Sequence, residues 1–153
     1  MEFASNPHIL ASVESTWASV LGIKAVLAQN VAGTPSPNFM TAIIHISGEW
    51  RGAIVMSFDQ VSANSVASGM YSMPAEEIPA EDMTDAIGEI SNFVGGSLKM
   101  ALAGMNNLSL PSVIYGNHHE AFIHSSKHIN STLFEAEGSF FKVSVFEEKE
   151  RDL

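Results

Sequence analysis

Three polar side chains recur at helical spacing within residues 85–96, which read DAIGEISNFVGG. Asp85, Glu89 and Asn92 are three or four residues apart, so a helix of about 3.6 residues per turn places them on one face. A carboxylate and an amide on one face can bind and orient polar groups of a partner. The same spacing also describes the solvent-facing side of an ordinary amphipathic helix, so spacing alone leaves both interpretations open.

The other residues on this face favour a binding role. An ordinary solvated face is built from good helix formers such as Lys, Arg, Gln and Ala. Here the polar strip is accompanied by Gly88, Gly95 and Gly96, and each glycine costs about 1 kcal/mol relative to alanine in a helix interior. Small residues let the backbone of a partner approach closely, and Phe93 and Met100 at the border offer it apolar contacts.

The opposite side of the same helix is apolar. The helical pattern runs from Met83 to about Gly104, and its apolar positions share one broad sector that we expect to face the core. These positions are Ile87, Ile90, Val94, Leu98, Ala101 and Met105.

Length and composition indicate one globular domain, residues 1–153. Hydrophobic residues make up 46% of the chain and charged residues 16%. The net charge of −10, with only seven basic residues, argues against nucleic acid as a partner, because phosphate binding needs clustered Lys and Arg. The absence of cysteine excludes disulfides and thiolate metal sites. Neither a signal peptide nor a transmembrane segment is apparent, so we expect a cytoplasmic protein without a membrane partner.

Helical and strand patterns alternate along the rest of the chain. Helices are expected over residues 6–21 and 60–71, and an acidic, proline-bearing connector over 74–82 leads into the long helix. Strands are expected over 23–31, 39–47, 50–58, 108–122, 131–137 and 139–147, with hairpin turns at Gly48-Glu49 and Gly138.

The order of these elements predicts a pseudo-two-fold α+β fold. Residues 41–48 (TAIIHISG) and 131–138 (STLFEAEG) occupy equivalent places, each ending in a turn glycine. The arrangement α-β-β-β / α / α-β-β-β implies a largely antiparallel sheet of about six strands with helices packed on one face. In the last strand, Phe141, Val143 and Val145 would face the helices, with Lys142 and Ser144 on the other side.

The polar strip and the residues after it resemble the signature of the CheC/CheX chemotaxis phosphatases. The pattern is Asp85-x3-Glu89-x2-Asn92, then Gly95 and Lys99, then Pro111-Ser-Val-Ile-Tyr-Gly116. A single well-formed motif makes the chain more similar to CheX than to CheC, which usually carries two. The resemblance covers nearly the whole chain, although the interval from Asn92 to Pro111 is a few residues shorter than usual in the family.

The resemblance implies dephosphorylation of a phospho-aspartate on a CheY-type receiver domain of a response regulator. It assigns Asn92 to positioning the attacking water and Glu89 to docking in the receiver active site. Asp85 and the flanking Gly88, Phe93, Gly95, Gly96 and Met100 would support the site or dock the partner. The receiver's own Mg²⁺ would stabilise charge, so the chain needs no cofactor or metal of its own. Relatives of this kind also imply a homodimer.

The first helix offers no second copy of the motif. Glu14-Ser15-Thr16-Trp17 stands where a second site would lie, but a tryptophan replaces the asparagine. We therefore expect one active site, with Trp17 in the core.

Two alternatives remain open. A catalytically silent module could use the same surface to sequester a receiver or to join a signalling assembly. A metal-dependent hydrolase could instead use the imidazoles of His118, His119, His124 and His128, although their spacing matches no established zinc pattern. Serine hydrolase and nucleotide-binding motifs are absent from the sequence.

Overall fold

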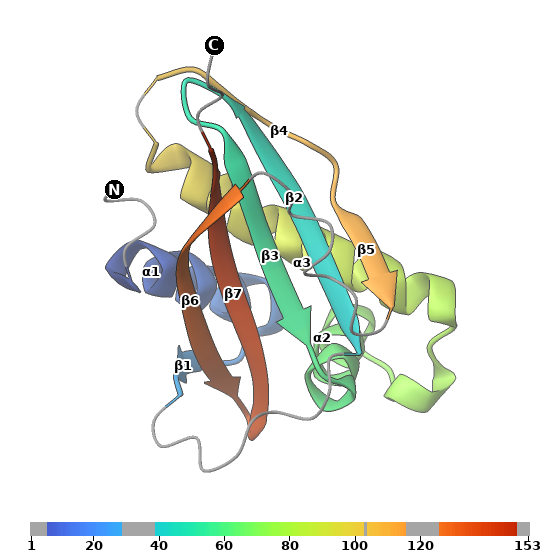
Figure 1. The fold of residues 1–153 in the computed structure, drawn as a ribbon. Coiled ribbons are helices and arrows are strands. Elements are labelled where there is room, and N and C mark those ends of the chain that lie inside the picture. Colours follow the sequence, from blue (N-terminus) through green and yellow to red (C-terminus); the bar gives the residue numbers. More distant parts are fainter. Residues whose placement is uncertain (1–5, 29–38, 103, 116–125, 150–153) are drawn as a thin grey trace.

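The chain folds as one antiparallel sheet with its helices on one face (Figure 1). The computed structural model describes residues 6–28, 39–102, 104–115 and 126–149. The helices are α1 (Asn6–Thr16), a short π-helix (Trp17–Leu21), α2 (Gln60–Tyr71), a 3-10 turn (Ala75–Glu77) and α3 (Ala80–Met100). The strands are β1 (Ala25–Leu27), β2 (Met40–Gly48), β3 (Gly52–Phe58), β4 (Asn106–Leu108), β5 (Ser112–Tyr115), β6 (Ser126–Ala136) and β7 (Ser139–Glu148).

The strand order is β1-β6-β7-β3-β2-β4, and β5 pairs with β2 next to β4. All described pairs are antiparallel, and β3 and β7 meet at the centre of the sheet. Each hairpin receives its outer strand from the other half of the chain, since β1 pairs with β6 while β4 and β5 pair with β2. The order of the elements follows the predicted pseudo-two-fold arrangement, but the sequence did not predict this exchange, and the described residues form seven strands rather than about six.

The core lies between the sheet and the helices. Alternating side chains of the central strands point toward the helices, so Phe141, Val143 and Val145 are buried as predicted. The rings of Trp17 and Phe141 stack with centroids 4.3 Å apart. Lys142 and Ser144 lie on the other face, where Ser144 is buried and its Oγ lies 2.8 Å from Ser131 Oγ.

Element boundaries depart from the sequence prediction in several places, and β6 begins at Ser126, five residues before the strand expected over 131–137. The strand expected over 108–122 is divided into β4 and β5 at Ser109–Pro111, because proline lacks the N–H that a strand donates to its neighbour. The strand expected over 23–31 is described only as the short β1, and residues 29–31 and 116–122 lie outside the described residues. The long helix was expected from Met83 to about Gly104 but runs from Ala80 to Met100. It therefore begins three residues before its predicted start and ends about four residues before its predicted end.

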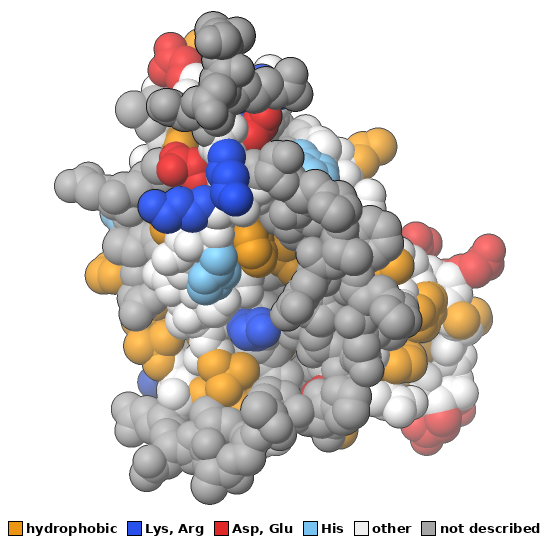
Figure 2. Space-filling model, viewed as in Figure 1, with side chains coloured by type: hydrophobic (Ala, Val, Ile, Leu, Met, Phe, Trp, Pro, Cys, Tyr) orange, Lys and Arg blue, Asp and Glu red, His pale blue; other side chains and the backbone are white. Residues whose placement is uncertain are grey.

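The face of the sheet opposite the helices is mixed in character (Figure 2). Near the top of this view, basic side chains lie beside acidic ones. A hollow of 760 Å³ at the end of the sheet has the same mixture in its lining, which consists of Glu49, Trp50, Arg51, Lys127, Glu147, Glu148 and Lys149. Within the described part of the chain, no helix is long and apolar enough to cross a bilayer.

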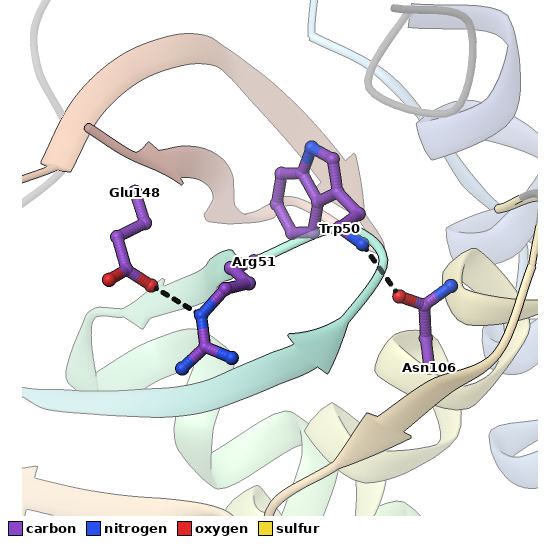
Figure 3. Close-up of polar contacts among 4 residues, drawn as sticks. All are labelled: Trp50, Arg51, Asn106 and Glu148. Carbon is purple, nitrogen blue, oxygen red and sulfur yellow. Dashed lines mark hydrogen bonds and ion pairs between the residues drawn. The ribbon is translucent and has the colours of Figure 1, made fainter. Parts of the chain in front are cut away.

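The β2–β3 turn ties the strand after α3 to the sheet (Figure 3). The backbone N–H of Trp50 donates to Asn106 Oδ1 at 2.9 Å, and Arg51 Nε lies 3.0 Å from Glu148 Oε2. Asn106 begins β4, so this contact fixes the path of the chain as it leaves α3. The exposed Arg51–Glu148 pair contributes little to stability, because solvent screens it.

Candidate functional site

The polar strip of α3 lies on its exposed face. Asp85, Glu89 and Asn92 are all exposed, as their spacing predicts. Phe93 is 50% exposed and Met100 is 87% exposed, although both are large apolar side chains. The helix therefore presents a carboxylate and an amide together with unburied apolar groups, a combination suited to contact with a partner.

The apolar sector of α3 packs into the core over most of its predicted length. Ile87, Ile90, Val94 and Leu98 are completely buried, in agreement with the prediction. Ala101 is exposed and Met105 is 84% exposed, so the prediction of a core position was wrong for both. The helix ends at Met100, and the chain beyond it no longer follows the helical repeat that assigned these two residues to the core.

The three glycines of α3 divide into two environments. A Cβ placed on Gly88 would lie 3.4 Å from side-chain atoms of Pro111 and Val113, and one on Gly95 would lie 3.2 Å from Ile44 Cδ1. Both glycines are buried against the sheet, which corrects the expectation that they clear space for a partner. A Cβ on Gly96 would meet nothing within 4 Å, so the surface is open to a partner there.

A groove runs beside the polar strip, between α3 and the segment that leads into β5. Its volume is 310 Å³. The lining residues are Thr84, Asp85, Gly88, Glu89, Asn92, Pro111 and Val113. The groove thus joins the predicted polar residues to a second wall that comes from a distant part of the sequence.

That second wall was not predicted as part of the site, although Pro111 and Val113 belong to the motif that carries the family resemblance. Ser109, just before it, is held to β2 by two hydrogen bonds: its N–H donates to His45 O, and its Oγ accepts from the N–H of His45, each at 2.9 Å. Leu110, between Ser109 and the wall, is 87% exposed. The proline after the helix was the available sequence signal, but only the β2–β5 pairing places it opposite Gly88.

Acidic side chains gather just before and within the first turns of α3, so the local charge is negative. Glu76, Glu77 and Glu81 are exposed, and Figure 2 shows acidic side chains at the right-hand edge, where Figure 1 places the α2–α3 connection. Partial burial raises the pKa of Tyr71, and the carboxylates of Asp82, Asp85 and Glu89 raise it further. The Tyr71 hydroxyl donates to the backbone carbonyl oxygen of Asp82 at 3.2 Å. This negative charge favours a partner surface with positive charge.

Trp17 is a core residue, as predicted. It is 1% exposed and stacked on Phe141, whereas Asn92 is exposed on its helix. Glu14 is exposed, but it lines a separate groove with Leu10, β1 and Glu135. The first helix therefore does not present Glu14 and Trp17 together on one exposed face.

The histidine cluster falls largely outside the described residues, which exclude His118, His119 and His124. His128 is exposed, with Nε2 2.7 Å from Ser131 Oγ and its ring against Phe146. Within residues 6–28, 39–102, 104–115 and 126–149, His, Asp and Glu side chains form no group of three that could hold a metal ion.

Comparison with known proteins places the groove within a matched region. Residues 40–135, which include α3 and the β5 wall, match the family described as chemotaxis phosphatase CheX. A CheY-P phosphatase CheX from Thermotoga maritima is 29% identical over 113 residues, which make up 71% of this chain and 73% of that relative.

Solved structures share the fold over almost the entire chain. The chemotaxis protein CheX from Vibrio vulnificus has a TM-score of 0.78 and 21% identity, covering 97% of both chains. A chain of the CheX-CheY-BeF3-Mg²⁺ complex from Borrelia burgdorferi has a TM-score of 0.66 and 17% identity, covering 92% of this chain and 96% of that one. These likenesses confirm the predicted α+β fold class.

Proposed function

Because the chain belongs to the chemotaxis phosphatase CheX family, we propose that it hydrolyses the phospho-aspartate of a CheY-type receiver domain. The observation that carries the proposal is the joint exposure of Glu89 and Asn92 beside the groove on α3. Two similarities support it: a relative named CheY-P phosphatase CheX, and a fold shared with a chain of a CheX-CheY complex.

In the proposed reaction, water attacks the phosphorus of the acyl phosphate. The bond between phosphorus and the aspartate oxygen breaks, so the products are the aspartate carboxylate, inorganic phosphate and a proton. The Asn92 amide orients the water in line with the breaking bond, and the Glu89 carboxylate docks against the receiver active site and orients it. Positioning of this kind needs no nucleophile on this chain. Mg²⁺ held by the receiver would supply charge stabilisation.

The surroundings of the two residues suit docking of a protein. Asp85 extends the acidic strip, Gly96 leaves open space, and Phe93 and Met100 offer apolar area that the receiver would cover. Gly88 and Gly95 support the site from beneath by allowing α3 to pack closely on Val113 and Ile44. We further propose that the protein acts in the cytoplasm as a homodimer.

The test is loss of phosphate from phosphorylated receiver domains in the presence of Mg²⁺, using a panel of receivers from the same organism. Asn92→Ala should lower the rate by about 10²-fold, the scale typical of a lost positioning group, with little change in melting temperature. Asn107→Ala is the matched control, because Asn107 is an exposed asparagine on β4 outside the groove. Glu89→Gln should weaken receiver binding as well as turnover.

The outcomes separate catalysis from binding alone. Unchanged turnover in Asn92→Ala would contradict the assigned role of the amide. If the wild-type protein bound phosphorylated receivers tightly without accelerating hydrolysis, the alternative of a silent binding module would replace this proposal.

A further inference from the structure

The hydroxyl of Tyr115, the last residue of β5, meets the first turn of α3. Tyr115 Oη lies 3.0 Å from Thr84 Oγ1 and 3.3 Å from the backbone carbonyl oxygen of Ala80, and its one proton can be donated to either oxygen. Thr84 Oγ1 donates to the same carbonyl oxygen at 3.0 Å. We call the contact of Tyr115 with Thr84 and Ala80 the brace.

The brace lies at one end of the groove. Thr84 lines the groove directly, while Tyr115 follows Val113 on the opposite wall by two residues. At the floor, Gly88 keeps α3 within close packing distance of Pro111 and Val113. The brace is therefore a second attachment between the same two walls, made by hydrogen bonds rather than by packing.

β5 depends on such attachments to hold its place. It is four residues long and pairs with β2, at the edge of the sheet. Its approach is fixed by Ser109, which is bonded to His45. Without the brace, the Tyr115 end would retain its β2 pairing and the edge-on contact of its ring with Phe39. Short edge strands with few attachments open readily, so the wall would gain freedom relative to α3.

We propose that Tyr115 and Thr84 are positioning residues, which hold the β5 wall at a set distance from Glu89 and Asn92. This inference rests on the proposed function, because the consequence it predicts is for docking of the receiver in the groove. A groove of fixed width is preorganised for its partner, so loosening one wall weakens binding before it alters the hydrolysis step. The expected signature is a higher KM for the phosphorylated receiver with an unchanged kcat.

Tyr71 provides a matched control, which separates an effect on the groove from a general loss of stability of α3. Tyr71, the other tyrosine, donates its hydroxyl to the carbonyl oxygen of Asp82 in the same turn of α3, but from α2 and outside the groove lining. Tyr71→Phe removes an equivalent hydrogen bond from the same helix end. If the hydrogen bond only stabilises α3, the melting temperature and the KM should change alike in both variants. If it holds the groove wall, the KM should rise only in Tyr115→Phe.

The experiment measures kcat, KM and melting temperature for four variants and the wild type. Tyr115→Phe and Thr84→Val should each raise KM about three- to tenfold, the equilibrium equivalent of one hydrogen bond. Thr84→Ser keeps the hydroxyl and should restore the wild-type KM. Tyr71→Phe should leave KM unchanged. An unchanged KM in Tyr115→Phe, or an equal rise in Tyr71→Phe, would overturn the proposal.

Amide hydrogen exchange across residues 112–115 tests the brace without any activity. Exchange should be faster in Tyr115→Phe than in the wild type and unaffected in Tyr71→Phe. If the wild-type protein lacks phosphatase activity, the proposed function fails, yet faster exchange would still show that the hydroxyl holds the wall. Unaltered exchange in Tyr115→Phe would refute the brace whatever the activity.

Discussion

At the level of single residues, neighbouring side chains between Asp85 and Asn92 on α3 have very different surroundings. Asp85, Glu89 and Asn92 reach solvent, while Ile87 and Ile90 between them are completely buried. Substitutions on the exposed strip can therefore change function without a cavity or an unpaired buried group. For this reason, Asn92→Ala separates a catalytic effect from a folding effect.

The raised pKa of Tyr71 makes the stability of the protein depend on pH above neutrality. Its raised pKa means that the folded state favours the protonated phenol, so its contribution to stability is present below pH about 10 and is lost as pH rises through the folded pKa. The free energy of unfolding, measured with urea between pH 8 and 11, should fall more for the wild type than for Tyr71→Phe. A parallel decline in both proteins would contradict the raised pKa.

At the level of elements, the two sides of α3 have different packing requirements, and these differ even between the consecutive residues Gly95 and Gly96. Toward the sheet it needs glycine, because Gly88 and Gly95 lie against Val113 and Ile44. Toward solvent, Gly96 has no such neighbour. Gly88 and Gly95 therefore allow α3 to pack closely on the sheet, whereas Gly96 leaves the exposed surface of the helix open.

Gly96→Ala and Gly95→Val should act in opposite directions on stability. Gly96→Ala should stabilise the protein by about 1 kcal/mol, because alanine favours a helix and its Cβ meets open space. Gly95→Val should destabilise it by about 1–3 kcal/mol through overpacking against Ile44 and Leu108. Thermal or urea unfolding measures both changes. Equal losses from the two substitutions would refute the distinction between the glycines.

At the scale of the whole molecule, the sheet is built by exchange between two halves. β3 and β7 form its centre, and each half supplies the outer strand of the other hairpin. β1 lies at one end of the sheet, where Val26 and Leu27 are partly exposed. An edge strand with apolar side chains is commonly covered by a partner, which accords with the proposed homodimer.

The homodimer is tested by the mass of the protein in solution. Sedimentation equilibrium at micromolar concentration should give about twice the 16.4 kDa chain mass, since two copies of the chain would associate. Substituting a charged residue for Leu27 should shift the equilibrium toward monomer if β1 is the contact. A monomeric mass for the wild-type protein at all concentrations would refute the prediction.

The exposed strip of α3 and the order of the elements could be predicted from the sequence alone. Helical and strand periodicities are local, so Glu89 and Asn92 fall on one face wherever the helix packs, and the two hairpins follow from their turns. The turn at Glu137-Gly138 is an example, since both residues adopt the positive φ that such a turn requires. The family motif could also be recognised from the sequence, because it lies in the single stretch from Asp85 to Gly116.

The end of α3, the burial of its glycines and the wall opposite the polar strip became known only from the three-dimensional structure. Each depends on contacts between residues far apart in sequence, such as Gly88 with Val113 or Thr84 with Tyr115, and local periodicity carries no information about these. Extending the helical repeat to Met105 predicted a core position for it, but the helix ends at Met100 and Met105 is exposed. The exposed strip of α3 could be predicted from the sequence. The groove could not, because its second wall is formed by Pro111 and Val113, which the pairing of β5 with β2 brings beside α3.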